Sequence, residues 1–275
     1  MYHSLPASRH SQRQNIPRIL IITVLTVLTC AVMLHVHGIV AKDWQDEFHM
    51  ANRILTPTGA STYSILFPGF QLVLASKHAK LTTTVLDETK EINGIMTRVV
   101  EEREERHGAL FEVSRNFVAI DQKTGDVFSF GETVAFYKQG KVVSHAGSWQ
   151  AYTNSNRPGL IIPGDPHAGM TYYQELAPGV AMGRAEILSI ADRVPTPAGT
   201  WNNCVTMVAY IKNKWLDLIA PSEYRAYAPG IGIVQEQDMK LVSYGYIKSP
   251  HLALPPAGAV ALGVAHPNPP AGTPH

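Results

Sequence analysis

Residues 81–101 read LTTTVLDETKEINGIMTRVVE, and this stretch predicts the fold. Residues 81–89 alternate and are rich in threonine and valine, and residues 95–101 resume an extended pattern. Asn93 and Gly94 stand between the two runs, and this dipeptide is the strongest short signal for a β-hairpin turn. The stretch therefore predicts an antiparallel hairpin.

Further strands are predicted on both sides of this hairpin, separated by turns rich in glycine and proline. They cover residues 71–76, 110–121, 127–131 and 135–137 and, beyond a turn-rich middle at 154–169, residues 171–176, 185–194, 199–211, 216–226, 232–236 and 239–246. No alternation of strands and helices is present, which excludes a doubly wound sheet. We predict an all-β domain with one mainly antiparallel, strongly curved sheet, in the form of a half-open barrel. A two-sheet β-sandwich is the alternative.

The charged run at residues 101–108 connects two of these strands. Such a run is most often a solvated surface, so it is predicted to be an exposed hairpin tip.

The two halves of the domain share an order of elements: a turn, a strand, a loop, an alternating aromatic strand, a glycine turn and a short apolar strand. The last two strands of this order are residues 111–120 and 125–130 in the first half, and 222–228 and 230–235 in the second. The order predicts an internal duplication, although alternation alone also makes strands resemble one another.

An uncharged apolar run at residues 19–34 follows Arg9, Arg13 and Arg18 and precedes an acid-rich segment at 42–47. Arginines hold their side of such a run in the cytoplasm, so the rest of the chain is predicted to lie outside it. The expected location is the cell envelope, with the β domain either membrane-anchored or secreted into the periplasm or beyond.

Three fates of the apolar run stay open. Its length suits a signal-peptide core, with Ala41 just before the cleavage point, whereas residues 35–40 extend it towards the ~20 residues of a membrane anchor. Cys30 offers a third possibility, lipid attachment. If the run is uncleaved, the membrane is a partner through residues 19–41.

The sequence thus divides into five parts. Residues 1–18 are a cytoplasmic basic segment, 19–41 a signal peptide or single transmembrane helix, 42–62 a linker or short helix, and 63–248 the antiparallel β domain. Residues 249–275 are rich in proline, alanine and glycine and are predicted to be a disordered tail.

The charge and cysteine content narrow the function classes. The chain has 23 basic and 22 acidic residues among 275, so it lacks the basic footprint of a nucleic-acid-binding protein. Cys204 is the only cysteine beyond the apolar run, so an internal disulfide is excluded and a buried position is expected for this side chain.

Several short motifs resemble, in their order, an uncharacterised family of secreted or membrane-anchored bacterial β-sheet proteins. They are Phe67-Pro68-Gly69, Phe130-Gly131-Glu132, Gly147-Ser148-Trp149, residues 158–166, Tyr172-Tyr173-Gln174-Glu175, Asn203-Cys204 and Tyr227-Ala228-Pro229-Gly230-Ile231-Gly232. The resemblance covers residues 63–246. It implies an exported β-sheet domain, and it implies no reaction and no catalytic residues.

Aromatic residues are the candidate ligand-binding groups, because they would make an apolar or carbohydrate-binding groove if they lined a concave sheet. The candidates are Trp149, Tyr172, Tyr173, Trp201 and Tyr227. The alternative is that they fill the core.

The segment from Pro229 to Gly232 predicts a structural turn. Pro229 presets φ, Gly230 permits a positive φ after it, and Gly232 allows close packing.

Catalytic and metal-binding signatures are missing from the sequence. It contains no Gly-x-Ser-x-Gly nucleophile motif, and His145, Asp165 and His167 lack a metal-ligand spacing. Glu175 is expected to make a polar contact between strands rather than to form half of a carboxylate pair. No catalytic residue, metal or cofactor is therefore predicted.

The predicted function is a non-enzymatic exported envelope module that binds an apolar ligand or an envelope protein. One alternative is a structural or assembly subunit of a membrane complex. The other is a hydrolase whose site is assembled from scattered residues, for which adjacent carboxylates in a cleft would be the sign.

Overall fold

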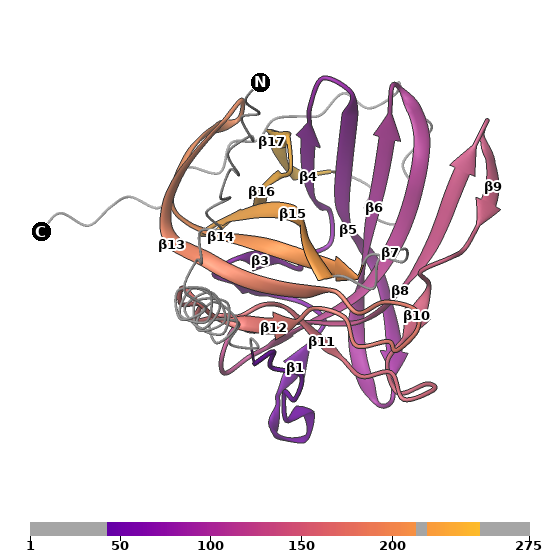
Figure 1. Cartoon of the computed structure of the whole chain (residues 1–275), viewed down its shortest axis with the longest axis vertical. Helices are drawn as coiled ribbons and strands as arrows, with labels where there is room; N and C mark the ends of the chain where they lie inside the picture. The colour runs from indigo at the N-terminus through magenta and orange to yellow at the C-terminus, as the bar shows by residue number, and fades with distance from the viewer. Residues whose placement is uncertain (1–42, 213–218, 248–275) are drawn as a thin grey trace, which may run out of the picture. The chain divides into compact units, whose positions relative to one another are not determined.

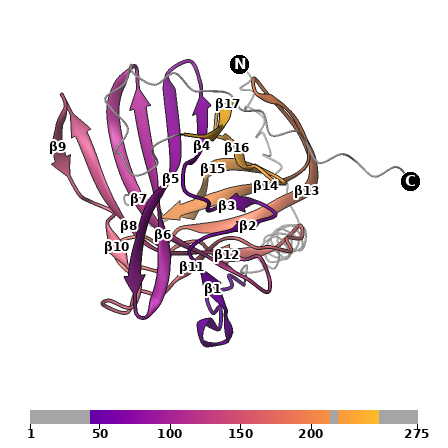
Figure 2. The ribbon, with the colours of Figure 1, turned by 180° about the vertical axis from the view of Figure 1, so that it is seen from behind.

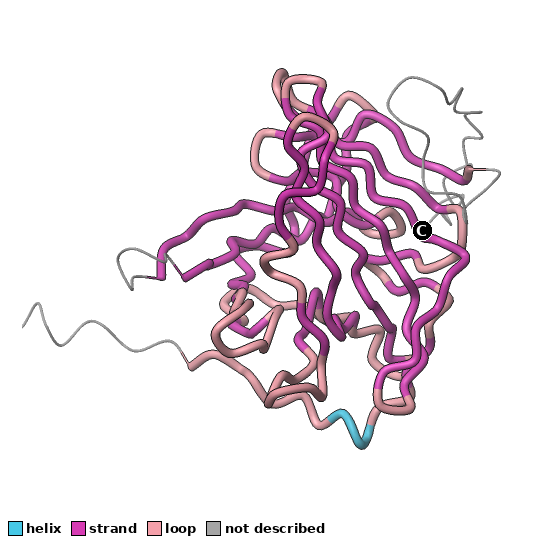
Figure 3. The backbone as a smooth tube through the Cα atoms, turned by 90° about the vertical axis from the view of Figure 1, so that its right-hand side faces the viewer, coloured by secondary structure: helices cyan, strands magenta, loops and turns pink. Residues whose placement is uncertain are grey.

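The computed structural model describes residues 43–212 and 219–247. The predicted hydrophobic helix at 19–41 and the predicted tail at 249–275 lie outside the described residues. Within those residues no helix is long and apolar enough to cross a membrane. The single helical element found there is the 3-10 turn η1 (Met50–Asn52), drawn in cyan in Figure 3.

All other regular elements of the described chain are strands, labelled in Figure 1. They are β1 (Leu55–Thr56), β2 (Ala60–Ser61), β3 (Ser64–Ile65), β4 (Phe70–Ala75), β5 (Ala79–Ile92), β6 (Ile95–Arg106), β7 (Ala109–Asp121), β8 (Val127–Lys138), β9 (Lys141–Ser144), β10 (Trp149–Gln150), β11 (Gly159–Ile162), β12 (Thr171–Tyr173), β13 (Arg184–Thr196), β14 (Gly199–Lys212), β15 (Ile219–Ala228), β16 (Gly232–Glu236) and β17 (Met239–Tyr246). The prediction of an all-β domain is confirmed for the described residues.

One antiparallel sheet of 15 strands dominates the domain. Its main path runs β10-β8-β7-β6-β5-β4-β17-β16-β15-β14-β13-β12, with β1 added to β7 and with β9 and β11 added to β8. The ends of this path, β10 and β12, are not paired with each other, so the sheet is not closed. Most neighbours along the path are also neighbours in sequence, as expected for a chain of hairpins.

The hairpin predicted from Asn93 and Gly94 is present between β5 and β6. Ile92 pairs with Ile95, and Asn93 and Gly94 have φ angles of 52° and 78°. Two positive φ angles are what the tight turn between right-twisted strands requires. This prediction is confirmed.

The sheet bends where its two halves join. β4 to β8 stand side by side, and β13 to β15 run across them (Figures 1 and 2). β17 links the halves, because it pairs with β4 and with β16. This bend gives the sheet a concave face that residues from both halves line.

Large apolar side chains from both halves form one core. Leu74, Phe128, Phe130 and Met207 are completely buried and belong to a single cluster. Cys204 is buried there as a free thiol, as expected.

The segment at residues 42–62, predicted as a linker or short helix, packs against the sheet. Phe48 is 2% exposed and meets Phe128 edge to face, with the ring centroids 5.8 Å apart. The β1 strand pairs with β7, and the Arg53 guanidinium contacts Asp121 at 3.0 Å. Most of this segment therefore belongs to the β domain, which starts before residue 63.

The prediction that residues 101–108 form a solvated tip is wrong. β6 continues to Arg106, and the turn itself is only His107 and Gly108, with φ angles of 51° and 77°. The charged residues stay in the strand because β7 pairs with them along its length. Successive charged side chains of β6 therefore point to opposite faces of the sheet.

Candidate functional site

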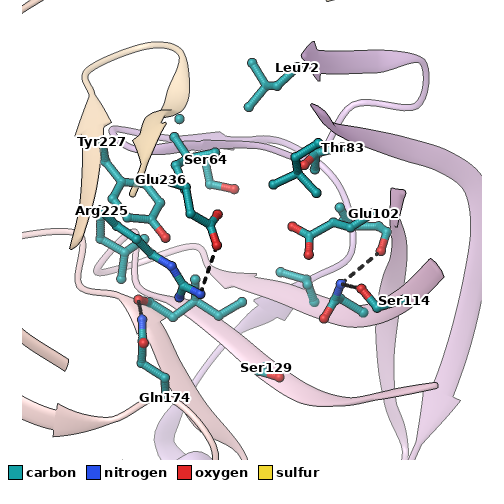
Figure 4. Close-up of a pocket in the computed structure, with 18 of the residues that line it drawn as sticks. Ser64, Leu72, Thr83, Glu102, Ser114, Ser129, Gln174, Arg225, Tyr227 and Glu236 are labelled. Carbon is teal, nitrogen blue, oxygen red and sulfur yellow. Dashed lines mark hydrogen bonds and ion pairs between the residues drawn. The ribbon is translucent and has the colours of Figure 1, made fainter. Parts of the chain in front are cut away.

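A cavity of about 720 Å³ lies on the concave face of the sheet (Figure 4). We call it the concave cavity. Its acidic lining consists of Glu102, Glu104, Glu112, Glu132, Glu175, Glu223, Glu236 and Asp238, and its basic lining of Arg106 and Arg225. Apolar side chains, among them Phe70, Leu72, Leu81 and Val100, complete the wall. The cavity therefore combines an apolar surface with an excess of carboxyl groups.

The alternation of side chains between the two faces of β6 and β7 brings one group of charged residues to the cavity. Residues two apart in a strand share a face, so Glu102, Glu104 and Arg106 of β6 all reach the cavity. Register aligns the next strand with them, because Glu102 pairs with Ser114 and Glu104 with Glu112. The charged run that the sequence assigns to a tip thus forms one wall of the cavity.

β15 and β16 supply the opposite wall in the same way. Glu223, Arg225 and Tyr227 follow one another at intervals of two in β15, and Arg225 pairs in register with Glu236 of β16. The Arg225 guanidinium lies 2.6 Å from the Glu223 carboxylate and 3.4 Å from that of Glu236, and the latter contact is drawn in Figure 4. Burial opposes the charge of Arg225, but Glu236, Tyr227 and Glu223 raise its pKa well above the ordinary value.

Other acidic groups of the lining have no such partner. Burial raises the pKa of Glu102 to about 7, and the charge of Glu236 adds to this effect. Burial and the nearby Glu104 likewise raise the pKa of Glu112. Ionisation of these two groups is therefore less favourable in the free protein than that of an exposed glutamate.

Glu132 and Glu175 form a carboxyl pair within the lining. Burial, followed by the charge of Glu175, raises the pKa of Glu132 to about 8, and Glu132 hydrogen-bonds to Glu175. Burial also raises the pKa of Glu175, against the effects of Arg225, the Gly183 amide and the Glu132 hydrogen bond. The arrangement is that of two carboxyl groups that share a proton, because two negative charges this close and this buried repel each other.

Gly183 allows Glu175 to occupy this place. A β-carbon at residue 183 would lie 2.7 Å from the Glu175 Oε2 atom. The Gly183 carbonyl accepts hydrogen bonds from the amides of Gln174 at 2.8 Å and Glu175 at 3.2 Å. This close approach of two backbone segments holds the carboxyl at the cavity wall.

The five aromatic candidates are dispersed. Tyr227 lines the cavity, whereas Trp149 and Tyr172 are buried in the core. Tyr173 packs under the Arg184 guanidinium, 4.8 Å from its ring centroid, and Trp201 meets the Tyr244 ring edge to face. Of the five, Tyr227 is the only one in the cavity lining that the described residues form.

The segment from Pro229 to Gly232 turns the chain at the edge of the cavity. Gly230 has a φ of 73°, and its amide donates a hydrogen bond to the Thr62 carbonyl at 2.7 Å. Gly232 has a φ of 111°, and a β-carbon there would make an ordinary contact with Leu72 at 3.5 Å. Both glycines therefore have positive φ angles, and Gly232 is part of the cavity lining.

Sequence reasoning missed the acidic residues of the cavity. The spacing of Glu102, Glu104 and Arg106 was a usable signal, because a strand that continues through this run puts all three on one face. Glu132 and Glu175 offered no such signal, since a long stretch of chain separates them.

The described residues form no metal site. No group of three or more histidine, cysteine, aspartate or glutamate side chains in those ranges could hold a metal ion.

Comparison with known proteins finds no matching family model, no matching curated protein and no matching solved structure. Functional assignments for this chain therefore rest on the geometry of the concave cavity.

Proposed function

We propose that this protein is a non-enzymatic, exported envelope module that binds a small polar molecule in the concave cavity. The observation that carries the proposal is a 720 Å³ cavity into which charged groups from both halves of the sheet converge. Cavities of roughly 300–1,000 Å³ are the usual size for small-molecule sites in proteins. The charged lining favours a polar ligand over the apolar one that the aromatic residues suggested.

The lining also supports a ligand with an apolar portion. Phe70, Leu72 and Leu81 offer apolar surface beside the carboxyl groups. Sites of this kind gain affinity from apolar contact and orient the ligand through a few polar groups.

A cavity-filling substitution tests the binding proposal. Ser64 of β3 lines the cavity, so Ser64→Trp should obstruct it and abolish binding. Val143→Trp adds an equal side chain at an exposed position of β9 outside the lining and should bind normally. Both variants and the natural protein would be purified intact from membranes, and native mass spectrometry would measure the retained ligand. Retention by Ser64→Trp equal to that of the natural protein would refute the site.

Export is proposed from the sequence, on the charge difference across residues 19–34. A reporter that is active only outside the cytoplasm, fused after Tyr246, should be active, and protease added to intact spheroplasts should remove the domain. Activity of a cytoplasm-only reporter at that position would overturn the location.

A hydrolase is the second candidate, and the Glu132–Glu175 pair favours it. Because the two carboxyl groups share a proton, the pair provides a proton donor and a proton acceptor at one point of a cavity wall. Glu175 would take a proton from an attacking water while Glu132 gave one to the oxygen of the bond being broken. Glu132→Gln should then abolish turnover of an ester panel.

We further propose that the open sheet is a half-open barrel built from a duplicated unit, in which β5 to β8 correspond to β13 to β16. The order of elements supports this, since each set runs as consecutive antiparallel neighbours along the sheet. Membership of the bacterial motif family is likewise a proposal, supported by the ordered motifs alone.

A further inference from the structure

The cations of the concave cavity are already engaged by carboxylates. Arg225 contacts Glu223 and Glu236, and the Arg106 Nε atom lies 2.6 Å from Glu104 Oε1. The lining therefore has no uncommitted arginine or lysine within the described residues. With eight acidic and two basic side chains, the lining disfavours an anionic ligand.

Apart from the exposed Asp238, four half-buried carboxyl groups of the lining are left without an ion pair in the described part of the chain. They are Glu102, Glu112, Glu132 and Glu175. Figure 4 shows the Glu102 carboxyl turned into the cavity, on the side opposite Arg225 and Glu236. Glu132 and Glu175 have each other as neighbours, which adds negative charge rather than neutralising it.

A deeply buried hydroxyl beside these groups also has free bonding capacity. Ser114 is 4% exposed and lines the cavity next to Glu102 in Figure 4. Its oxygen accepts a hydrogen bond from Asn116 at 3.2 Å, and its second lone pair has no donor among the residues that the structure describes. Buried polar groups are normally satisfied, so this capacity is available to a bound molecule.

We propose that the ligand of the concave cavity is an aliphatic amine whose ammonium groups pair with the unpaired glutamates of the lining. This inference rests on the proposed binding function and names the class of ligand. The apolar wall of Phe70, Leu72 and Leu81 suits the alkyl chain, and the unpaired carboxyl groups suit the ammonium ends.

The charges around each glutamate determine how binding depends on pH. Glu102 faces Glu236, Arg225 and Glu112, and Glu132 faces Glu175, Glu102 and Glu112. With pKa values of about 7 for Glu102 and about 8 for Glu132, both groups hold protons over part of the neutral range. A cation within ~4–6 Å lowers such pKa values, so binding releases those protons.

The coupling between amine binding and proton release determines how the affinity changes with pH. Affinity for an amine should rise as the pH rises from about 6 to about 8, by up to about tenfold per pH unit for each proton released, and should level off above that range. A neutral ligand of the same length should show no such rise.

Titration calorimetry of the full-length protein with 1,6-diaminohexane and with 1,6-hexanediol tests the proposal. Titrations at pH 6, 7 and 8, in two buffers of different ionisation enthalpy, give both the affinity and the number of protons released. We expect the diamine to bind with proton release and with higher affinity at pH 8 than at pH 6, and the diol to bind at least tenfold more weakly.

Isosteric variants locate the effect. Glu102→Gln and Glu132→Gln should each weaken diamine binding at pH 8 at least tenfold and reduce the protons released. Glu91→Gln, at an exposed position of β5 outside the lining, should change neither quantity. Thermal melts would show that each variant is folded.

Two outcomes would overturn the inference while leaving the proposed function standing: equal binding of diol and diamine, or co-purification of a neutral or anionic ligand that Ser64→Trp abolishes. Loss of binding in Glu91→Gln equal to that in Glu102→Gln would also overturn it. Failure of both probes, together with no retained ligand, would refute the proposed function itself.

Discussion

The carboxyl group of Glu132, on β8, shares a proton with that of Glu175, in the segment that follows β12. The chain brings these groups together from separate parts of the sheet and leaves them without an ion pair in the described residues. Because the pair keeps a proton that isolated carboxyls lose, it connects the protonation of the cavity to the stability of the fold.

Glu132→Gln should flatten the pH dependence of stability. The pKa of Glu132 rises from 4.5 to about 8 on folding, so the native state binds more protons between these values and stability falls as pH rises through them. Glutamine still donates to Glu175 but has no proton to lose. Melting temperatures from pH 5 to pH 8.5 should agree with the natural protein at the acid end and exceed it at pH 8.5. Parallel curves for the two proteins would contradict this.

Arg225→Met should destabilise the domain by about 3 kcal/mol, because it leaves Glu223 and Glu236 without their cation at the cavity wall. Arg157→Met is the matched control, since its partners Asp46 and Glu47 are about half exposed, and such pairs contribute about 0–1 kcal/mol. Urea unfolding at pH 7.5 measures both variants. Equal losses of unfolding free energy in the two variants would show that the Arg225 contacts stabilise the domain no more than an exposed ion pair does.

Phe48→Ala should lower the free energy of unfolding by about 3–5 kcal/mol, because it removes a fully buried ring from the core. Phe67→Ala removes the same side chain from a position that is 44% exposed and should cost much less. The comparison tests whether the segment before residue 63 is an integral part of the domain. If Phe48→Ala lowers the free energy of unfolding no more than Phe67→Ala does, the segment before residue 63 does not contribute to the stability of the domain.

Gly230→Val should lower the melting temperature. The residue has a φ of 73°, which strains a β-branched side chain by about 1–3 kcal/mol even though a β-carbon there would meet no atom within 4 Å. Gly230→Asn should be milder, since asparagine tolerates positive φ. Thermal melts rank the three proteins, and unchanged melting of Gly230→Val with loss of ligand retention would instead assign this glycine to the binding site.

Local patterns were sufficient for the strands. The Asn93-Gly94 turn forms as predicted, and the strands predicted at residues 232–236 and 239–246 coincide with β16 and β17. These features depend on neighbours in sequence: φ preferences at the turn and alternation along one strand. The prediction for residues 101–106 was wrong because it followed the charged composition of the run and not the continuing alternation of the strand. That alternation places Glu102, Glu104 and Arg106 on one face.

The amino-acid sequence by itself determined the all-β class and the Asn93-Gly94 hairpin turn, because these follow from local backbone preferences and from alternation along single strands. Only the tertiary structure decided which charges meet. The pairing of β17 with β4 joins the two halves and bends them around one cavity, and this brings Arg225 to Glu236 and Glu132 to Glu175. Such contacts depend on long-range register and sheet curvature, which no local pattern encodes.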